Sequence, residues 1–296
     1  MAATSSSPNL PDRFRNLIPQ RFRSDINVVP VVRLTGVIGF STPLKPGLTL
    51  ASCAKALERA FTTSKAKAVA LSINSPGGSP VQSHLIYSRI RQLAKENKVP
   101  VLAFIEDVGA SGGYMIACAG DEIFCDRSSI VGSIGVVGAT FGFDKAIERL
   151  GIERRVYTSG ERKVMLDPFL PENPEDVQRL KAIQKDIHED FIALVKGSRG
   201  EKLRGPESAL FSGEYWAGGK ALEYGLVDAL GDLRTVLRER FEEKVKTPVI
   251  AERGWLARRF SGTGEMELSD LMRHPGLGEE VLSALEARAL WSRFGL

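Results

Sequence analysis

Hydrophobic residues along this chain follow two alternating patterns. Short, continuous apolar runs are typical of buried strands, and they occur at residues 27–38, 68–73, 101–105 and 122–125. Apolar residues at helical spacing lie between these runs, at residues 50–61, at residues 81–94 and over a short stretch ending at Ala119. Strands alternating with helices predict an α/β fold in which a largely parallel sheet is flanked by helices.

The second half of the chain is mainly helical by the same criterion. Asn173 followed by Pro174 is a typical helix start, and an apolar stripe continues from there to Gly197. This pattern predicts a long structural helix packed on the sheet. Further expected segments are a charged loop at residues 196–204 and helices at residues 212–225, 232–244 and 279–291.

Proline, glycine and charge divide the chain into three expected regions. Residues 1–26 form a basic lead-in broken by prolines, residues 27–249 a single domain, and residues 250–296 a tail with a short amphipathic helix. No apolar run approaches the ~20 residues of a transmembrane helix, and no secretory signal core is visible. We therefore expect a cytoplasmic protein; the lead-in is also compatible with weak contact to a membrane surface or with an organelle transit peptide.

Composition excludes several classes of protein. Hydrophobic residues make up 43% and charged residues 26% of the chain, as in an ordinary soluble domain. The net charge of +4 is too small to indicate nucleic-acid binding. Cys53, Cys118 and Cys125 lack metal-ligand spacing and are expected to be reduced and buried. We therefore expect neither a metal nor a cofactor.

Two glycine loops follow predicted strands. The sequence Asn-Ser-Pro-Gly-Gly-Ser occupies residues 74–79, and Gly-Ala-Ser-Gly-Gly occupies residues 109–113. In open parallel sheets ligands bind at the carboxyl ends of the strands, where both loops are expected. Glycines in such loops allow the backbone to approach a ligand closely. The two loops together therefore predict a functional site at this edge of the sheet.

Ser111 is the candidate nucleophile, because it lies among glycines directly after a strand-like run. A serine hydroxyl needs a neighbouring base to take its proton. The histidines are poor candidates, since His84 and His188 fall in helical stretches and His274 falls in the tail. The search therefore turns to lysine, and Lys163 lies in a loop just before an apolar run.

A lysine base has to be neutral. A free lysine has a pKa of ~10.4, so being half neutral near pH 8 requires a fall of about 2–3 units. Desolvation in a closed apolar pocket can supply that fall. Ser133, in Gly-Ser-Ile-Gly at residues 132–135, is a candidate hydroxyl to orient the amine. Taken alone, a lysine in a polar loop such as Lys163 is also typical of a solvated surface.

The attacked carbonyl needs backbone donors for its developing negative charge. Gly77 and Gly78, after the second strand, and Gly112, beside Ser111, are the candidates for this oxyanion hole. Loss of one such donor typically costs ~3 kcal/mol of transition-state stabilisation. Apolar residues near the loop are candidate walls of a pocket for small or apolar substrate side chains: Val108, Tyr114 and Met115.

Several motifs occur in one order along residues 28–240. They are Asn-Ser-Pro-Gly-Gly at 74–78, Ala-Ser-Gly-Gly-Tyr at 110–114, Gly-Ser-Ile-Gly-Val at 132–136, Ser-Gly-Glu-Arg-Lys at 159–163, and a closing motif within 211–228. So ordered, they resemble the signal peptide peptidase A family of Ser–Lys dyad serine peptidases. The resemblance implies that Ser111 is the nucleophile, Lys163 the general base and Ser133 the residue that positions it. Gly78 and Gly112 would form the oxyanion hole.

The resemblance also implies a fold and an assembly. The family shares its fold with caseinolytic peptidases and crotonases, and its members assemble into rings. In these rings neighbouring subunits can contribute the serine and the lysine. Many members are anchored in a membrane and digest cleaved signal peptides, whereas this sequence shows no anchor. That departure concerns the signal-peptide substrate and leaves the implied chemistry unchanged.

These observations lead to one main hypothesis and two alternatives. The main hypothesis is a ring-forming serine endopeptidase that hydrolyses short or unfolded peptides through an acyl-enzyme, with signal-peptide remnants among the candidate substrates. One alternative is a crotonase-like acyl-CoA enzyme on the same fold, for which Glu106 and Asp107 are the candidate carboxylates. The other is a catalytically silent oligomeric scaffold.

Overall fold

The centre of the molecule is a seven-stranded sheet, seen in a computed structural model that describes residues 26–39, 47–160, 162–250 and 288–295. The strand order is β1-β2-β3-β4-β7, with β5 pairing β3 and β6 pairing β5. All pairs are parallel except β5 with β6. The strands are β1 (Val31–Thr35), β2 (Val69–Ser75), β3 (Val101–Ala110), β4 (Glu122–Cys125), β5 (Ile130–Gly132), β6 (Tyr215–Ala217) and β7 (Ala229–Leu230).

The longest strand, β3, has two halves with different neighbours. Residues 102–105 pair with β4, and residues 108–110 pair with β5. The pairing of β3 with β2 shifts register between Ile73 and Ser75, at the level where the two halves meet. A register irregularity of this kind bends a strand and redirects its end. The second half of β3 therefore carries its last residue, Ala110, towards β5 rather than β4.

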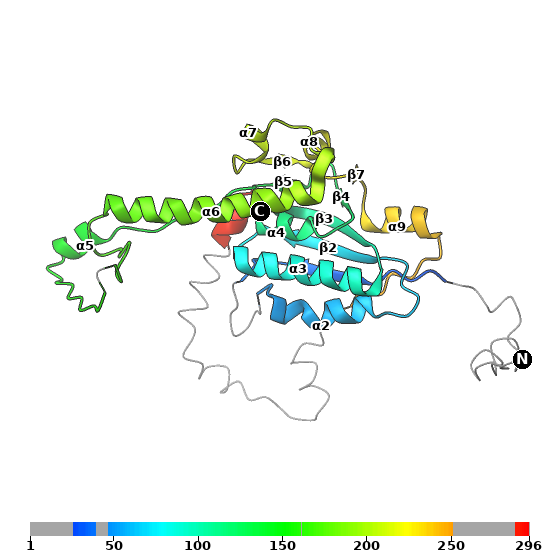
Figure 1. Cartoon of the computed structure of the whole chain (residues 1–296), viewed down its shortest axis with the longest axis horizontal. Helices are drawn as coiled ribbons and strands as arrows, with labels where there is room; N and C mark the ends of the chain where they lie inside the picture. The colour runs from blue at the N-terminus through cyan, green and yellow to red at the C-terminus, as the bar shows by residue number, and fades with distance from the viewer. Residues whose placement is uncertain (1–25, 40–46, 161, 251–287, 296) are drawn as a thin grey trace, which may run out of the picture.

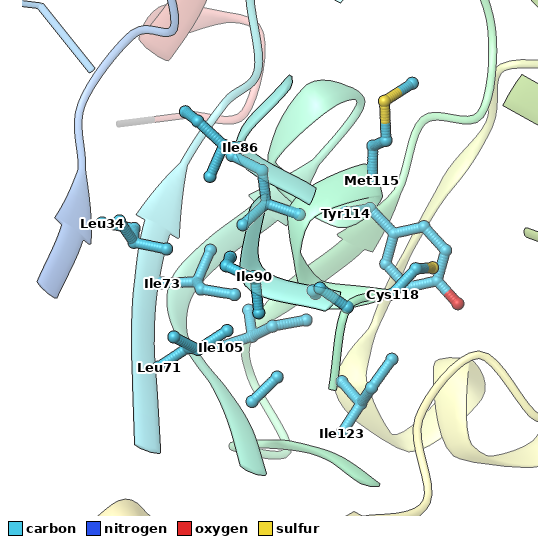
Figure 2. Packing of buried hydrophobic residues seen from close by; sticks show 14 of the residues in the cluster. Leu34, Leu71, Ile73, Ile86, Ile90, Ile105, Tyr114, Met115, Cys118 and Ile123 are labelled. Atoms are coloured by element: carbon cyan, nitrogen blue, oxygen red, sulfur yellow. The ribbon is translucent and has the colours of Figure 1, made fainter. Parts of the chain in front are cut away.

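Helices cover both faces of the sheet (Figure 1). The larger apolar cluster joins one face to α2 (Leu50–Phe61), α3 (Pro80–Asn97), α4 (Gly112–Ala117) and the end of α6 (Pro174–Arg199). Figure 2 shows part of it, where Ile73 and Ile105 of the sheet face Ile86 and Ile90 of α3. A smaller cluster joins the opposite face to α9 (Leu233–Phe241) through Leu237. The predicted α/β fold with a largely parallel sheet flanked by helices is confirmed.

Local sequence explains where the main helices begin. Thr49 and Ser52 form a reciprocal capping box at the start of α2. At α3 the Ser79 side chain accepts a hydrogen bond from the Gln82 N–H, and Pro80 is the first helical residue. The predicted bounds of α2 are confirmed to the residue. The expected strand at 27–38 is the shorter β1 flanked by isolated bridges at Val28 and Ile38.

Two expectations for the second half of the chain were wrong. The helix expected at residues 212–225 is interrupted, because β6 lies between α7 (Glu207–Leu210) and α8 (Gly218–Glu223). Tertiary pairing decides this segment: residues 215–217 bind β5 edge to edge, which overrides their local preference. The charged loop expected at 196–204 begins later, since α6 continues to Arg199 and a 3-10 turn follows at Gly200–Lys202.

The long helix α6 packs on the body of the molecule only at its C-terminal end. Its buried residues are Phe191, Val195 and Arg199, all in the last third of the helix. The rest projects away from the sheet and carries α5 (Asp144–Arg149) and the surrounding loops at its far end (Figure 1). We call residues 136–160 and 162–187 the arm. The expectation that α6 packs on the sheet therefore holds for its last third alone.

Other expectations concern parts of the chain outside these ranges. Residues 1–25, His274, Glu161 and most of the predicted helix at 279–291 lie outside the described residues; residues 288–292 are helical. Within the ranges that the structure describes, no helix combines the length and the apolar character needed to cross a bilayer.

Candidate active site

Ser111 lies on a sharp turn between β3 and α4. Its backbone has φ 52° and ψ −123°, a conformation that L-residues rarely adopt. The strained turn is held from both sides, because the Ser111 N–H donates to the Gly132 carbonyl at 2.8 Å and the Met115 N–H donates to the Ser111 carbonyl at 3.0 Å. Such a turn presents a side chain at the end of the sheet, as nucleophilic serines on strand-to-helix turns require.

The Gly77–Gly78 loop packs directly against this turn. Gly77 has φ +100°, and a Cβ at this position would lie 2.7 Å from the Ser111 Cβ and 2.9 Å from the Gly112 nitrogen. Gly78 has φ +141°, and a Cβ there would collide with the backbone of Ile38. Both positions thus require glycine for conformation and for space. The loop expected to supply oxyanion donors does lie beside Ser111.

The hydrogen bonds of this loop distinguish the three candidate donors. The Gly77 N–H donates to the Ser75 hydroxyl at 3.2 Å, and that hydroxyl in turn donates to the Gly36 carbonyl at 2.7 Å. Among the described residues no acceptor is found for the N–H of Gly78 or of Gly112. Gly112 is the first residue of α4, where an N–H has no partner within the helix. Gly78 and Gly112 therefore have donors available to an anion, whereas the N–H of Gly77 is used internally.

Ser133 follows β5, the strand next to Ser111. Ala110 pairs with Gly132, so the residues after them, Ser111 and Ser133, leave adjacent strands at the same edge. Ser133 also has a positive φ of 54°, and its N–H donates to the Glu214 carbonyl at 2.6 Å. The structure thus brings Ser133 and Ser111 to one edge.

Lys163 is placed elsewhere in the single chain. It lies in the arm, its side chain is exposed, and its N–H donates to the Gly160 carbonyl at 3.2 Å. In the described part of the chain, no hydrogen bond or ion pair joins its side chain to Ser111. Beside it, the arm loop and the start of α6 enclose a cavity of about 520 Å³. Its lining combines apolar residues with charged ones of both signs, including Met165, Leu170, Glu172 and Arg179.

The expected walls of the substrate pocket lie in the core of the single chain. Val108 and Tyr114 are fully buried, and Met115 is nearly so. The Tyr114 hydroxyl donates to the Leu226 carbonyl at 2.7 Å, and its ring lies beside Cys118 (Figure 2). These side chains are packed in the interior and present no open surface to a substrate.

Four other ionisable side chains considered in the sequence, His84, His188, Glu106 and Asp107, have partners of their own in the structure. His84 stacks on Tyr87, and His188 bonds to the Ile134 carbonyl through Nε2 at 3.0 Å. Glu106 and Asp107 accept hydrogen bonds at 2.6 Å from the side chains of Ser72 and Asn74 on β2. Among the described residues, no group of three or more His, Cys, Asp and Glu could hold a metal ion.

Comparison with known families identifies the chain. The family model of peptidase family S49 matches residues 93–246, slightly more than half of the chain. The chain belongs to peptidase family S49. That assignment confirms the resemblance drawn from the motifs, since S49 is the family of the signal peptide peptidases. The matched region contains Ser111, Ser133 and Lys163.

Individual relatives agree with the S49 assignment to different degrees. "Putative protease slr0021" of Synechocystis is 32% identical over 77% of this chain and 84% of its own length. "Na(+)/H(+) antiporter NhaA" of Brucella abortus is 53% identical over 97% of this chain. This chain spans only 39% of that protein, so the antiporter name describes a longer molecule. A mutant of the 1510-N membrane-bound stomatin-specific protease aligns with 72% of this chain and 84% of its own, at 18% identity and a TM-score of 0.42.

Sequence reasoning missed the residues that support the site. Ser75 and Ser83 are buried serines that pack against the glycine loops, and a Cβ on Gly112 would collide with the Ser83 hydroxyl. Arg199 is buried at the end of α6, on the same helix face as Phe191 and Val195. The available signal was a polar residue in an otherwise apolar stripe or strand, since such a residue needs a buried partner.

Proposed function

We propose that this S49 member is a serine endopeptidase that cleaves short or unfolded peptides. The observation that carries the proposal is the strained turn that presents Ser111 beside two backbone donors, the N–H groups of Gly78 and Gly112, for which the described residues provide no acceptor. A nucleophile next to a preformed anion site suits acyl transfer, because the carbonyl oxygen of the substrate becomes negative as the serine attacks.

The general base in this proposal is Lys163 of a neighbouring subunit. Lys163 is exposed on a projecting arm, so a second copy can accept it without rearrangement of its own fold. The arm also carries ten of the fourteen exposed large apolar residues among those described. They are Val137, Phe141, Phe143, Leu150, Ile152, Val156, Tyr157, Phe169, Leu170 and Ile183. Apolar surface concentrated in this way indicates a contact with another protein, and a second copy satisfies both the apolar arm and the missing base.

The reaction follows from these placements. The neutral amine of Lys163 takes the proton of the Ser111 hydroxyl while Oγ attacks the peptide carbonyl. The N–H groups of Gly78 and Gly112 bind the developing oxyanion, and Ser133 orients the amine. The protonated amine then gives its proton to the leaving nitrogen, which leaves an ester between Ser111 and the substrate. Water activated by the same lysine hydrolyses that ester.

The surroundings of the site favour apolar peptides. Val81 and Leu85, at the start of α3 next to the Gly77–Gly78 loop, are exposed by 66% and 40%. The cavity beside Lys163 adds some apolar residues, among them Met165 and Leu170, within a lining that is otherwise largely charged. Remnants of signal peptides have this apolar character and are one candidate class of substrate.

Labelling with a fluorophosphonate probe tests the proposal. Native protein should be labelled at Ser111, and Ser111→Ala and Lys163→Ala should each lose labelling and peptide cleavage, because each removes one half of the dyad. Lys145→Ala, another lysine of the arm, is the matched control and should keep both. Labelling at another serine, or cleavage unchanged in Lys163→Ala, would contradict the proposal.

A further inference from the structure

Arg199 is the last residue of α6, and only 1% of its side chain is exposed. Its Nη1 donates to Asp228 Oδ2 at 2.8 Å, and its Nε donates to the Gly225 carbonyl at 3.0 Å. Its Nη2 is buried and has no partner among the described residues. A buried ion pair that leaves a donor unsatisfied adds little net stability. The planar guanidinium instead fixes the end of α6 in one orientation, because it makes two hydrogen bonds in a rigid arrangement.

The segment that Arg199 binds also holds the helix that begins after Ser111. Tyr114 of α4 donates its hydroxyl to the Leu226 carbonyl at 2.7 Å, one residue after the Gly225 carbonyl that Arg199 binds. Ser198, the neighbour of Arg199, donates its hydroxyl to the carbonyl of Cys118 at 2.7 Å, and Cys118 ends α4. The end of α6, α4 and the 225–228 segment are therefore tied together at one point.

The position of the arm depends on the contacts between the end of α6, α4 and residues 225–228 far more than the position of α4 does. Every residue of α4 is buried, so the helix is held on several sides. By contrast, α6 is buried only at Phe191, Val195 and Arg199. Next to the arm, the side chain of His188 also bonds to the Ile134 carbonyl and so attaches α6 to the body of the molecule. With a rise of 1.5 Å per residue, α6 is about 39 Å long, so a tilt of about 3° at its end moves the start by about 2 Å. Misplacement of a catalytic group by ~1 Å can cost ~100-fold in rate.

We propose that Arg199 is a positioning residue for the reaction. By fixing the end of α6 to the 225–228 segment and to α4, Arg199 sets where the arm presents Lys163 to the neighbouring subunit. The inference rests on the proposed function, in which the dyad is completed between subunits. It assigns Arg199 to the subunit that donates the lysine rather than to the subunit that donates the serine.

Mixed assemblies of two full-length chains separate these roles. A Ser111→Ala chain can donate only the lysine, and a Lys163→Ala chain can donate only the serine, so labelling in the mixture reports dyads formed between chains. Arg199→Met is placed either in the lysine donor or in the serine donor, and the rate of fluorophosphonate labelling is measured. In the lysine donor it should slow labelling ~10- to 100-fold. In the serine donor it should slow labelling less than about 3-fold, because α4 has its other attachments.

Two further variants make the outcome decisive. Arg199→Lys keeps the positive charge but cannot make both hydrogen bonds in one geometry, so its labelling rate should lie between those of native Arg199 and Arg199→Met. If the Arg199→Met chain does not fold, Arg199→Lys is used in its place. Lys95→Met, at an exposed lysine in the last turn of α3 and outside the arm, should leave the rate unchanged in either chain. Equal slowing from both placements would overturn the role of Arg199 and leave the dyad intact. Absence of labelling in the mixture without Arg199 substitutions would overturn the dyad between subunits, and the role of Arg199 with it.

Discussion

Two glycines with nearly the same positive φ allow the effect of backbone strain to be distinguished from the effect of steric contact with the candidate nucleophile. Gly77 has φ +100° and Gly36 has φ +103°. A Cβ on Gly77 would lie 2.7 Å from the Cβ of Ser111, whereas a Cβ on Gly36 would have no atom within 4 Å. A larger effect of alanine at Gly77 than at Gly36 therefore reports the contact with the turn at residues 110–112, which contains Ser111.

We expect Gly77→Ala to abolish fluorophosphonate labelling and to lower the free energy of unfolding by more than Gly36→Ala does. The backbone conformation itself should cost about 1–3 kcal/mol in both variants. The added clash in Gly77→Ala must displace the Ser111 turn, so labelling should fail even where the protein is folded. Denaturant unfolding and probe labelling of both variants test this. Equal labelling in the two variants would show that the turn tolerates displacement.

At the scale of elements, the Asp228 carboxylate binds residues of α6, of β4 and of the 3-10 turn at once. Its carboxylate accepts hydrogen bonds at 2.8 Å from Arg199, from Lys202 and from the N–H of Ile123. Burial alone would raise the pKa of Asp228, but the hydrogen bonds from Arg199 and Lys202 outweigh it and hold that pKa below its usual range. A depressed pKa in the folded state means that the stabilisation is complete above the unfolded value of ~3.9 and is lost as pH falls through the folded value.

We therefore expect Asp228→Asn to be strongly destabilising near neutral pH and much less so in acid. Removing one partner of a buried pair typically costs about 3–5 kcal/mol, since the charge of Arg199 is left uncompensated. As pH falls below the unfolded value of ~3.9 towards the lower folded pKa of Asp228, the stabilisation by the native carboxylate declines, so the gap between the two proteins should narrow. Urea unfolding at about pH 7 and about pH 3 measures the difference. A gap of the same size at both pH values would contradict this account.

An exposed carboxylate provides the control for Asp228. Glu223 pairs with Lys220 at 2.6 Å on the surface of α8, and both side chains are well exposed. Surface pairs of this kind contribute little to stability, because solvent screens both charges. Glu223→Gln should therefore change the free energy of unfolding little at either pH, which separates the buried joint from a general effect of charge removal.

The same elements show what could be predicted from the sequence. The strands and helices up to Cys125 were predicted because each strand contains a continuous apolar run and each helix an apolar pattern of its own, and Thr49 and Ser79 cap the two longer helices. The Tyr-Trp-Ala strand β6 was missed because three residues contain no period, and its structure is decided by pairing with β5. The projection of α6 was missed for a related reason: an apolar stripe shows that a face will be covered, but not by which chain.

Some residues of the candidate site could likewise be placed from the sequence and others could not. The glycine loops and Ser111 were located because parallel strands bring their carboxyl ends to one edge. Ser133 was a candidate to orient the amine of Lys163, from its sequence context and from the resemblance, and the pairing of Ala110 with Gly132 brings it to the same sheet edge as Ser111. The place of Lys163 relative to Ser111 could not follow from spacing along one chain, because the arm carries it away from the body.

At the scale of the whole molecule, the arm predicts an obligatory assembly. Phe141 and Tyr157 are exposed by 78% and 90% in the single chain. Burial of one such side chain is worth about 1.5–3 kcal/mol, which corresponds to about a 10- to 100-fold change in a dissociation constant. We expect Phe141→Ser combined with Tyr157→Ser to give a species of lower mass with loss of labelling, measured by light scattering after size-exclusion chromatography.

A variant outside the arm serves as the control for assembly. Val249 is exposed by 55% and lies near β1, outside the arm. Val249→Ser removes apolar surface of a similar kind and should leave mass and labelling unchanged. A native mass in the double arm variant would show that the exposed apolar residues of the arm do not hold subunits together.

The buried cysteines make the arm accessible to spectroscopy. Cys53, Cys118 and Cys125 are all buried, and burial raises the pKa of Cys118 and of Cys125 to about 12. Thiolates are the reactive form, so native thiols of this kind should resist maleimide and nitroxide reagents at neutral pH. A single cysteine introduced at the tip of α5 could then carry a spin label or a fluorophore in an otherwise native chain. Inter-label distances would map how one protomer reaches the next in solution.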